Sequence, residues 1–411
     1  MNTQYKHKKR GATRPPKFSN RSSSPRRGSG GGGGGRFRSQ YIDPQKFINR
    51  KPTVQKEQVY EPNNLFTDFG FPHTVLENLK RMNISHPTKI QDEAIPHVLE
   101  GKDVIGLSDT GSGKTAAFVL PLIMKLKSKG DDGTALIIAP TRELAGQIQD
   151  DFNRFASGMH LYTTLCVGGM NINPQIRELR RGPSVIIGTP GRIKDLINQR
   201  HLDLSKTETF ILDEADRMLD MGFLPDIKSI ISAISGKPQT LCFSATITPA
   251  ITTLLDRMLE NPVTISVRAS QNGDHISQDI IYVKNNEARY QKLVETLNNI
   301  NYEKVLVFAE MKFTAAKIAG MLTADNFPAD SIHGNKNQTQ RKRSLDAFKK
   351  GKINILVATD VAARGLDIPN VTHVINFEQP QTYEDYIHRI GRTGRAGKEG
   401  QAYTFVVSKG K

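Results

Sequence analysis

The run SDTGSGKT at residues 108–115 has the composition of a phosphate-binding loop. Small residues let backbone N–H groups approach an anion closely, and this run lies between an apolar segment and a helical pattern. Lys114 could neutralise the β- and γ-phosphates, and the Thr115 hydroxyl could bind Mg²⁺. The strict pattern has Gly where this chain has Ser108, so a flexible glycine turn is the alternative. The flanking strand and helix favour the phosphate loop.

The acidic run Asp213-Glu214-Ala215-Asp216 follows the apolar residues 210–212. A carboxylate at the carboxyl end of a parallel strand lies where such sheets bind ligands. Asp213 could hold the water shell of Mg²⁺, and Glu214 could deprotonate a water that attacks the γ-phosphate. An acidic helix start is the alternative, since Asp and Glu favour helix N-termini. The phosphate loop upstream favours the metal-and-base interpretation.

The run HRIGRTGR at 388–395 brings two arginines, Arg392 and Arg395, close together beside glycines. Guanidinium groups can spread over the charge that develops on a transferring phosphoryl group, which is the arginine-finger role. A basic surface loop is the alternative interpretation.

Apolar runs that alternate with helical patterns predict the scaffold for these residues. Continuous Val/Ile/Leu runs separated by helices are typical of a parallel sheet covered on both faces. The predicted fold is therefore α/β, with two tandem doubly wound parallel-sheet domains behind an N-terminal tail. The expected strands are 104–107, 135–140, 164–169, 184–190, 210–216 and 240–246, then 279–283, 304–309, 354–359, 372–377 and 402–407. The expected boundaries are a tail at 1–60, a first domain at 61–267, a linker at 268–278 and a second domain at 279–411.

Charge is concentrated in the first 60 residues. They hold 15 Lys/Arg and two acids, so they carry +13 of the net charge of +16, and the other 351 residues carry only +3. A six-glycine run, five prolines and the absence of hydrophobic periodicity predict disorder. The interleaved aromatics would stack on bases while Lys and Arg meet phosphates, which favours single-stranded nucleic acid. These aromatics are Tyr5, Phe18, Phe37, Tyr41 and Phe47. A tail that only solubilises the protein is the alternative.

Composition also argues against several classes of protein. The cysteines, Cys166 and Cys242, lie in apolar runs and are expected to be buried core residues rather than a disulfide framework. The longest apolar run, 116–124, is far shorter than a membrane span, and the first residues lack the apolar stretch of a signal peptide. No His/Cys/acid cluster has ligand spacing. The sequence therefore predicts a soluble protein of a reducing, cytoplasmic compartment with no membrane contact. A monomer is expected.

Taken together, residues 65–407 resemble the DEAD-box RNA helicases of superfamily 2. The resemblance rests on a dozen motifs in order. Beside those above they include PTRELAGQ at 140–147, Gly168-Gly169, TPGR at 189–192, SAT at 244–246, HG at 333–334 and ATDVAARGLD at 358–367.

The resemblance implies that both domains are RecA-like, that ATP and Mg²⁺ are cofactors, and that each matching residue has a role. Phe66 would stack on adenine and Gln91 would read its edge. Implied nucleotide contacts are Thr110, Gly111, Ser112, Gly113, Lys114, Thr115, Asp213 and Asp367, with Glu214 as the base and Arg392 and Arg395 as fingers. Implied residues that couple hydrolysis to strand separation are Ser244, Thr246, Asp216 and His388. Implied RNA contacts are Pro140, Thr141, Arg142, Gly169, Thr189, Arg192, Gln338, Arg341, Thr359 and Arg364.

These roles describe an ATP-dependent RNA helicase that binds single strands without reading their sequence and opens short duplexes. Phosphate and sugar contacts position a strand, and contact with the 2′-OH would favour RNA. Two alternatives stay open: a DNA-directed ATPase motor, and a non-enzymatic RNA-annealing chaperone in which the tail does the work.

Overall fold

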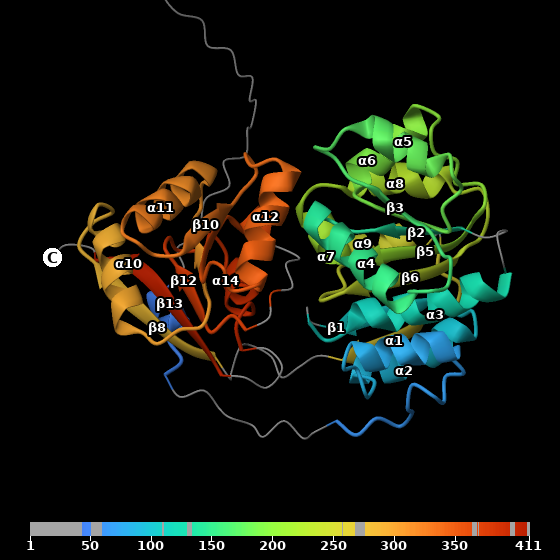
Figure 1. Cartoon of the computed structure of the whole chain (residues 1–411), viewed down its shortest axis with the longest axis horizontal. Helices are drawn as coiled ribbons and strands as arrows, with labels where there is room; N and C mark the ends of the chain where they lie inside the picture. The colour runs from blue at the N-terminus through green and yellow to red at the C-terminus, as the bar shows by residue number, and fades with distance from the viewer. Residues whose placement is uncertain are drawn as a thin grey trace, which may run out of the picture. The chain divides into compact units, whose positions relative to one another are not determined.

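The computed structural model describes residues 43–50, 60–108, 111–129, 134–256, 258–267, 276–363, 368, 370–394 and 399–408 (Figure 1). Among these residues, no helix is both long and apolar enough to cross a bilayer.

The first domain is built on a seven-stranded sheet with the order β3-β4-β2-β5-β6-β1-β7, in which all neighbouring strands run parallel. Its buried strands read as continuous runs of Val, Ile, Leu and Phe because both faces of the sheet are covered. The strands are β1 Val104–Ser108, β2 Thr134–Ile138, β3 Thr163–Cys166, β4 Val185–Gly188, β5 Thr207–Asp213, β6 Gln239–Ser244 and β7 Val263–Val267.

Two apolar clusters lie on opposite faces of this sheet. One joins the strands to α1 His73–Arg81, α2 Lys89–Leu99, α3 Lys114–Lys129 and α4 Arg142–Phe155. The other joins them to α5 Ile172–Leu179, α6 Pro190–Asn198, α7 Ala215–Asp220, α8 Leu224–Ala233 and α9 Pro249–Leu255. Helices on both faces leave the carboxyl ends of the strands as the open edge where ligands bind.

The second domain has a six-stranded parallel sheet with the order β10-β11-β9-β12-β13-β8. Its strands are β8 Ile276–Val283, β9 Val305–Phe308, β10 Ala329–Ile332, β11 Ile355–Ala358, β12 His373–Asn376 and β13 Gly400–Val407. Helices α10 Ala288–Asn299 and α11 Lys312–Ala324 pack on one face. Helices α12 Gln338–Lys349, α13 Asp360–Ala363 and α14 Tyr383–Ile390 pack on the other.

The predicted fold class is confirmed, and each predicted strand is found within a few residues of its expected position. Two strands were not predicted. β7 lies at the edge of the first sheet and is only partly buried, and β10 is a four-residue edge strand that contains Asp330 and Ser331. Neither has the continuous apolar run that marks a strand buried on both faces.

The structure corrects the predicted tail at residues 43–50. Pro44–Phe47 form a short 3-10 helix, η1, and Phe47 is fully buried in the second domain's apolar cluster. Phe47 therefore does not offer a ring to a base, in contrast to the expectation. The other four aromatics of the tail lie outside the described residues.

Both cysteines are buried core residues, as expected. Burial raises the pKa of each thiol to about 12, so both are protonated at neutral pH.

Candidate active site

The phosphate loop connects β1 to α3 and is held by the start of α2. Gly111 and Gly113 have φ of +92° and +95°, a conformation that glycine adopts without cost. The Gln91 Nε2 donates to the Gly113 carbonyl at 3.0 Å, and a Cβ atom on Gly113 would collide with that amide and with the Thr88 hydroxyl. Glycine is therefore required at this position by close approach as well as by backbone shape.

Lys114 begins α3 and is buried, with its ammonium donating to the Ser108 carbonyl at 2.8 Å. The Ser108 and Ser112 hydroxyls lie 2.9 Å apart and form a hydrogen bond within the loop. Ser108, which stands where the strict pattern has Gly, therefore stabilises the loop. Thr115 follows in the first turn and is half-buried. Thr110 lies outside the described residues.

Asp213 ends β5 and carries the most perturbed carboxylate of the first domain. It is 2% exposed, and its Oδ1 has no hydrogen-bond partner among the residues that the structure describes. Burial raises its pKa to about 7, while the positive charge of Lys114 acts in the opposite direction and Glu214 adds to the rise. A buried carboxylate oxygen without a partner beside an ammonium is suited to the hydrated cation of a nucleotide.

Glu214 has the left-handed conformation, with φ of +54° and ψ of 51°, directly after the strand. A non-glycine residue in this region is uncommon and stores strain that is typical of functional sites. The carboxylate is buried, and its Oε2 accepts from Arg217 Nη1 at 2.9 Å. The turn thus places Glu214 at the open edge, with an arginine to fix its side chain.

Asp216 links the acidic run to the end of β6. Its Oδ2 accepts from the backbone N–H groups of Ala245 and Thr246 at 3.0 and 2.9 Å and from the Thr246 hydroxyl at 3.2 Å. The Ser244 Oγ accepts from the Asp216 backbone N–H at 3.2 Å. The structure therefore brings together three of the four residues that the sequence assigned to coupling.

The two residues expected at adenine are engaged inside the protein. Gln91 is 4% exposed, and while its nitrogen holds Gly113, its Oε1 accepts from the Thr88 backbone N–H at 3.1 Å. Phe66 is 5% exposed and packs edge-on against Phe69, with ring centroids 6.4 Å apart. Gln91 acts here as a clamp on the phosphate loop, a contact that sequence reasoning did not foresee.

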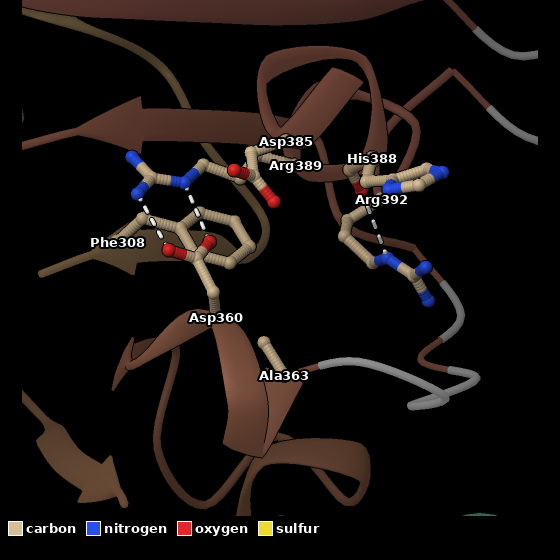
Figure 2. Close-up of a pocket in the computed structure, with 7 residues that line it drawn as sticks. All are labelled: Phe308, Asp360, Ala363, Asp385, His388, Arg389 and Arg392. Carbon is tan, nitrogen blue, oxygen red and sulfur yellow. Dashed lines mark hydrogen bonds and ion pairs between the residues drawn. The ribbon is translucent and has the colours of Figure 1, made fainter. Parts of the chain in front are cut away.

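Arginines dominate the corresponding edge of the second domain. Arg389 of α14 forms a bidentate pair with Asp360, at 2.6 and 2.7 Å, and Figure 2 shows the two parallel contacts. Arg392 is buried, and its Nε donates to the His388 carbonyl at 3.3 Å. His388 and Arg392 line the same small pocket as Asp360. Asp367 and Arg395 lie outside the described residues.

The predicted RNA contacts of the first domain gather at the carboxyl ends of β2, β3 and β4. Gly169 has φ of +71°, and a Cβ atom there would collide with the Arg142 guanidinium. Arg192 donates to Gln175 Oε1 at 2.8 Å and to the Met170 carbonyl at 3.1 Å. Thr141 and Thr189 are the N-caps of α4 and α6, and Pro140 precedes Thr141. Three adjacent strands thus bring backbone, hydroxyl and guanidinium donors to one edge.

The predicted RNA contacts of the second domain lie on two elements. Gln338 and Arg341 share the first turn of α12, which begins with a capping box formed by Asn337 and Gln340. Thr359 follows β11, and its carbonyl accepts from the N–H groups of Ala362 and Ala363. Arg364 lies outside the described residues.

Comparison with known proteins decides the family. Residues 88–254 match the family described as DEAD/DEAH box helicase, and residues 288–397 match the helicase conserved C-terminal domain. A relative, DEAD-box ATP-dependent RNA helicase 20 of Arabidopsis thaliana, is 42% identical over 363 residues, which cover 87% of this chain and 72% of the relative. The chain belongs to the DEAD-box family of ATP-dependent RNA helicases.

Two further similarities support this assignment. The helicase is 43% identical to the ATP-dependent RNA helicase CshA of Listeria monocytogenes over 341 residues, which cover 83% of this chain and 66% of CshA. Dbp5 of S. cerevisiae, solved with RNA and ADP BeF3, is 32% identical with a TM-score of 0.74, over 84% of this chain and 90% of Dbp5. As a member of this family the chain is an ATP-hydrolysing RNA helicase.

Sequence reasoning missed two positioning contacts in this helicase. Arg217 holds the predicted base Glu214, and Asp360 holds Arg389. Both arginines stand inside or directly after motifs that were recognised, DEAD and HRIGRTGR, so the signal was present. The Glu214–Arg217 pair has helical spacing and could have been inferred, whereas Arg389 and Asp360 lie 29 residues apart and leave no local pattern.

Proposed function

We propose that the helicase hydrolyses ATP with Glu214 as the base that orients and deprotonates the attacking water. Lys114 and the glycine-rich backbone bind the β- and γ-phosphates, where positive charge offsets the charge of the transition state. Arg392, with Arg395, meets the developing charge on the transferred phosphoryl group as fingers of the second domain. The water proton goes to the Glu214 carboxylate, which Arg217 holds in orientation.

Residues of the first domain also suit the binding of Mg²⁺. Thr115 would supply a hydroxyl, and Asp213 would hold the water shell of the ion through its unpartnered buried oxygen. The ion supplies charge neutralisation on the β- and γ-phosphates when it is bound.

Adenine recognition is assigned to Gln91 and Phe66. An amide has a second N–H and a second lone pair beyond those used within the protein, so Gln91 can contact the base edge while it holds Gly113. Base binding would then stiffen the loop that binds phosphate. This link supports ATP as the preferred nucleotide.

The RNA is proposed to be a single strand or a short duplex, bound without sequence preference along the Arg142, Gly169 and Arg192 edge. Threonine hydroxyls, backbone N–H groups and guanidinium groups reach phosphates and sugars rather than base edges. Bending of one bound strand would open a short duplex, and hydrolysis would release it. The predicted cytoplasmic location and monomeric state stay predictions.

The observation that best supports this proposal is that the Asp216 carboxylate accepts hydrogen bonds from the backbone N–H groups of Ala245 and Thr246. It joins the acidic run, which carries the proposed base, to the segment after β6 by three hydrogen bonds. A shift in the position of Glu214 can therefore be transmitted to the residues that are proposed to couple hydrolysis to strand separation.

The test compares activators of hydrolysis and follows a labelled short duplex in the same solutions. We expect single-stranded RNA to stimulate hydrolysis, single-stranded DNA of the same sequence to do so far less, and duplex opening to require ATP. Equal stimulation by DNA would favour a DNA-directed motor. Strand annealing without any hydrolysis would favour the chaperone.

A further inference from the structure

Residues 43–50 form a compact segment on the second domain, although in sequence they precede the first. The Asp43 carboxylate accepts from the Gln45 backbone N–H at 3.0 Å and starts η1. Phe47 has no exposed surface and lies in the same apolar cluster as α12, α13 and α14. In Figure 1 this segment lies beside β8.

Three kinds of contact hold the segment in place. The Phe47 and Tyr386 rings have centroids 4.6 Å apart, and both side chains are fully buried. Asn49 and Gln278 exchange backbone hydrogen bonds of 2.8 and 2.9 Å as an antiparallel bridge on the edge strand β8. Arg50 pairs with Asp279 at 2.9 Å on the surface. Apolar burial, backbone hydrogen bonds and an ion pair therefore hold the segment in one position on the second domain.

Tyr386 connects this segment to the helix that leads to the arginines. Its hydroxyl donates to Gln278 Oε1 at 2.9 Å, so the residue that pairs with Asn49 also holds the ring that Phe47 covers. Tyr386 lies in α14, three residues before Arg389. Arg392 follows the end of that helix, where its Nε donates to the His388 carbonyl at 3.3 Å. The bidentate pair of Arg389 with Asp360 fixes the C-terminal half of α14. The Phe47 ring, the Gln278 amide and the Tyr383 ring, whose centroid lies 5.8 Å from that of Tyr386, contact Tyr386 in the middle of the helix.

We propose that Phe47 is a positioning residue for ATP hydrolysis, which acts through Tyr386 and α14 on the placement of Arg392. The inference rests on the proposed role of Arg392 as a finger. A segment that only covered apolar surface would matter for stability alone. A positioning segment changes the rate of the chemical step, because a shift of about 1 Å in a catalytic group can cost on the order of 100-fold.

The first variant is Phe47→Ala in the full chain, with Leu297→Ala as the matched control. Leu297 is buried in the same domain but packs on the opposite face of the sheet, away from α14. We expect Phe47→Ala to lower kcat of RNA-stimulated hydrolysis about tenfold and to leave KM for ATP within about twofold. Leu297→Ala should lower the thermal midpoint similarly and leave kcat near the wild-type value.

Two conservative variants separate positioning from loss of stability. Phe47→Leu keeps most of the buried apolar volume but loses the ring contact with Tyr386, so it should recover most of the thermal midpoint and leave kcat below the wild-type value. Tyr386→Phe keeps the ring and removes only the hydroxyl that donates to Gln278 Oε1, and it should lower kcat in the same direction.

The outcomes distinguish this inference from the proposed function. If Phe47→Ala and Leu297→Ala lower kcat equally, or if Phe47→Leu and Tyr386→Phe both retain the wild-type kcat, the segment only stabilises the domain. If Arg392→Ala retains wild-type kcat, it is the finger assignment that fails.

Discussion

The two domains differ in whether a buried charged group at the carboxyl ends of the strands has its partners within the protein. At the carboxyl ends of its strands the first domain has carboxylates, and buried Asp213 has an oxygen without a hydrogen-bond partner among the described residues. The second domain has guanidiniums there, and buried Arg389 is held by Asp360, by Asn376 Oδ1 at 3.2 Å and by the Glu378 carbonyl at 2.9 Å.

This difference separates groups that bind a ligand from groups that hold the structure. A buried polar group normally finds its partner within the protein, and the exceptions need an explanation. Asp213 is such an exception among the described residues, and Glu214, although Arg217 pairs with it, has a strained backbone. We assign both to the nucleotide. The Arg389 guanidinium has its hydrogen-bond partners within the protein, so we assign this residue a structural role. The finger role is assigned to Arg392.

The largest effect is expected for Arg392→Ala. Loss of one guanidinium from the transferring phosphoryl group should lower kcat on the order of 10,000-fold, with little change in KM for ATP. Arg392→Lys should restore only a small part, since an ammonium lacks the planar fork. Steady-state hydrolysis with saturating RNA checks both variants, and full activity of the Lys variant would show that charge alone suffices.

Asp360→Asn tests whether Arg389 has a structural role in the second domain. Loss of the bidentate pair leaves the buried Arg389 guanidinium with weaker partners. The free energy of unfolding should fall by about 2 kcal/mol, which is less than for a fully buried pair because Asp360 is partly exposed. Urea unfolding measures it. Glu260→Gln is the control, because it breaks an exposed pair with Lys237 and should cost less than about 0.5 kcal/mol. Equal costs would contradict the assignment of Arg389 to architecture.

Deletion of residues 1–39 tests the tail without the docked segment. These residues carry 11 Lys/Arg and no Asp or Glu. At low salt the affinity for single-stranded RNA should fall about tenfold, and its dependence on salt should flatten as fewer counterions are released. Titrations at several salt concentrations measure the slope. An unchanged slope would mean that the tail does not meet the RNA, while kcat at saturating RNA should stay the same.

The smallest effect is expected from His373 in the second domain. Burial lowers the pKa of this imidazole, although a hydrogen bond to Gln401 acts in the opposite direction. The folded state therefore favours the neutral ring, and stability is lost as the pH falls below the unfolded pKa of about 6.5, by at most about 1.4 kcal/mol per pH unit. Thermal unfolding between pH 7.5 and 5 measures this loss. His373→Gln should reduce the slope, and an equal slope would show that other groups cause it.

The buried strands could be predicted, and the candidate site residues proposed, because both leave local patterns in the sequence. Lys114, Asp213 and the strands around them could be predicted from a glycine-rich loop and apolar runs. Contacts between distant segments leave no such pattern. The docking of Phe47 on Tyr386 spans 339 residues (386 − 47), and nothing near Phe47 distinguishes it from the aromatics of the tail.

Backbone conformation was the second kind of feature that the sequence did not reveal. Glu214 has positive φ, although its residue type predicts an ordinary helix start. The hydrogen bonds of the Asp216 carboxylate depend on this turn, because it directs the acidic run toward the end of β6. Such strain becomes visible only when the strand, the turn and the neighbouring strand are in place.

The measurement that tests the central claim most directly is ATP hydrolysis by Glu214→Gln at saturating single-stranded RNA, beside RNA binding with and without ATP. The substitution keeps the size of the side chain and removes the base. The account predicts a kcat about 1000-fold below wild type and RNA binding that still responds to ATP. Hydrolysis at the wild-type rate would contradict the assignment of Glu214 and the division of chemistry between the two domains.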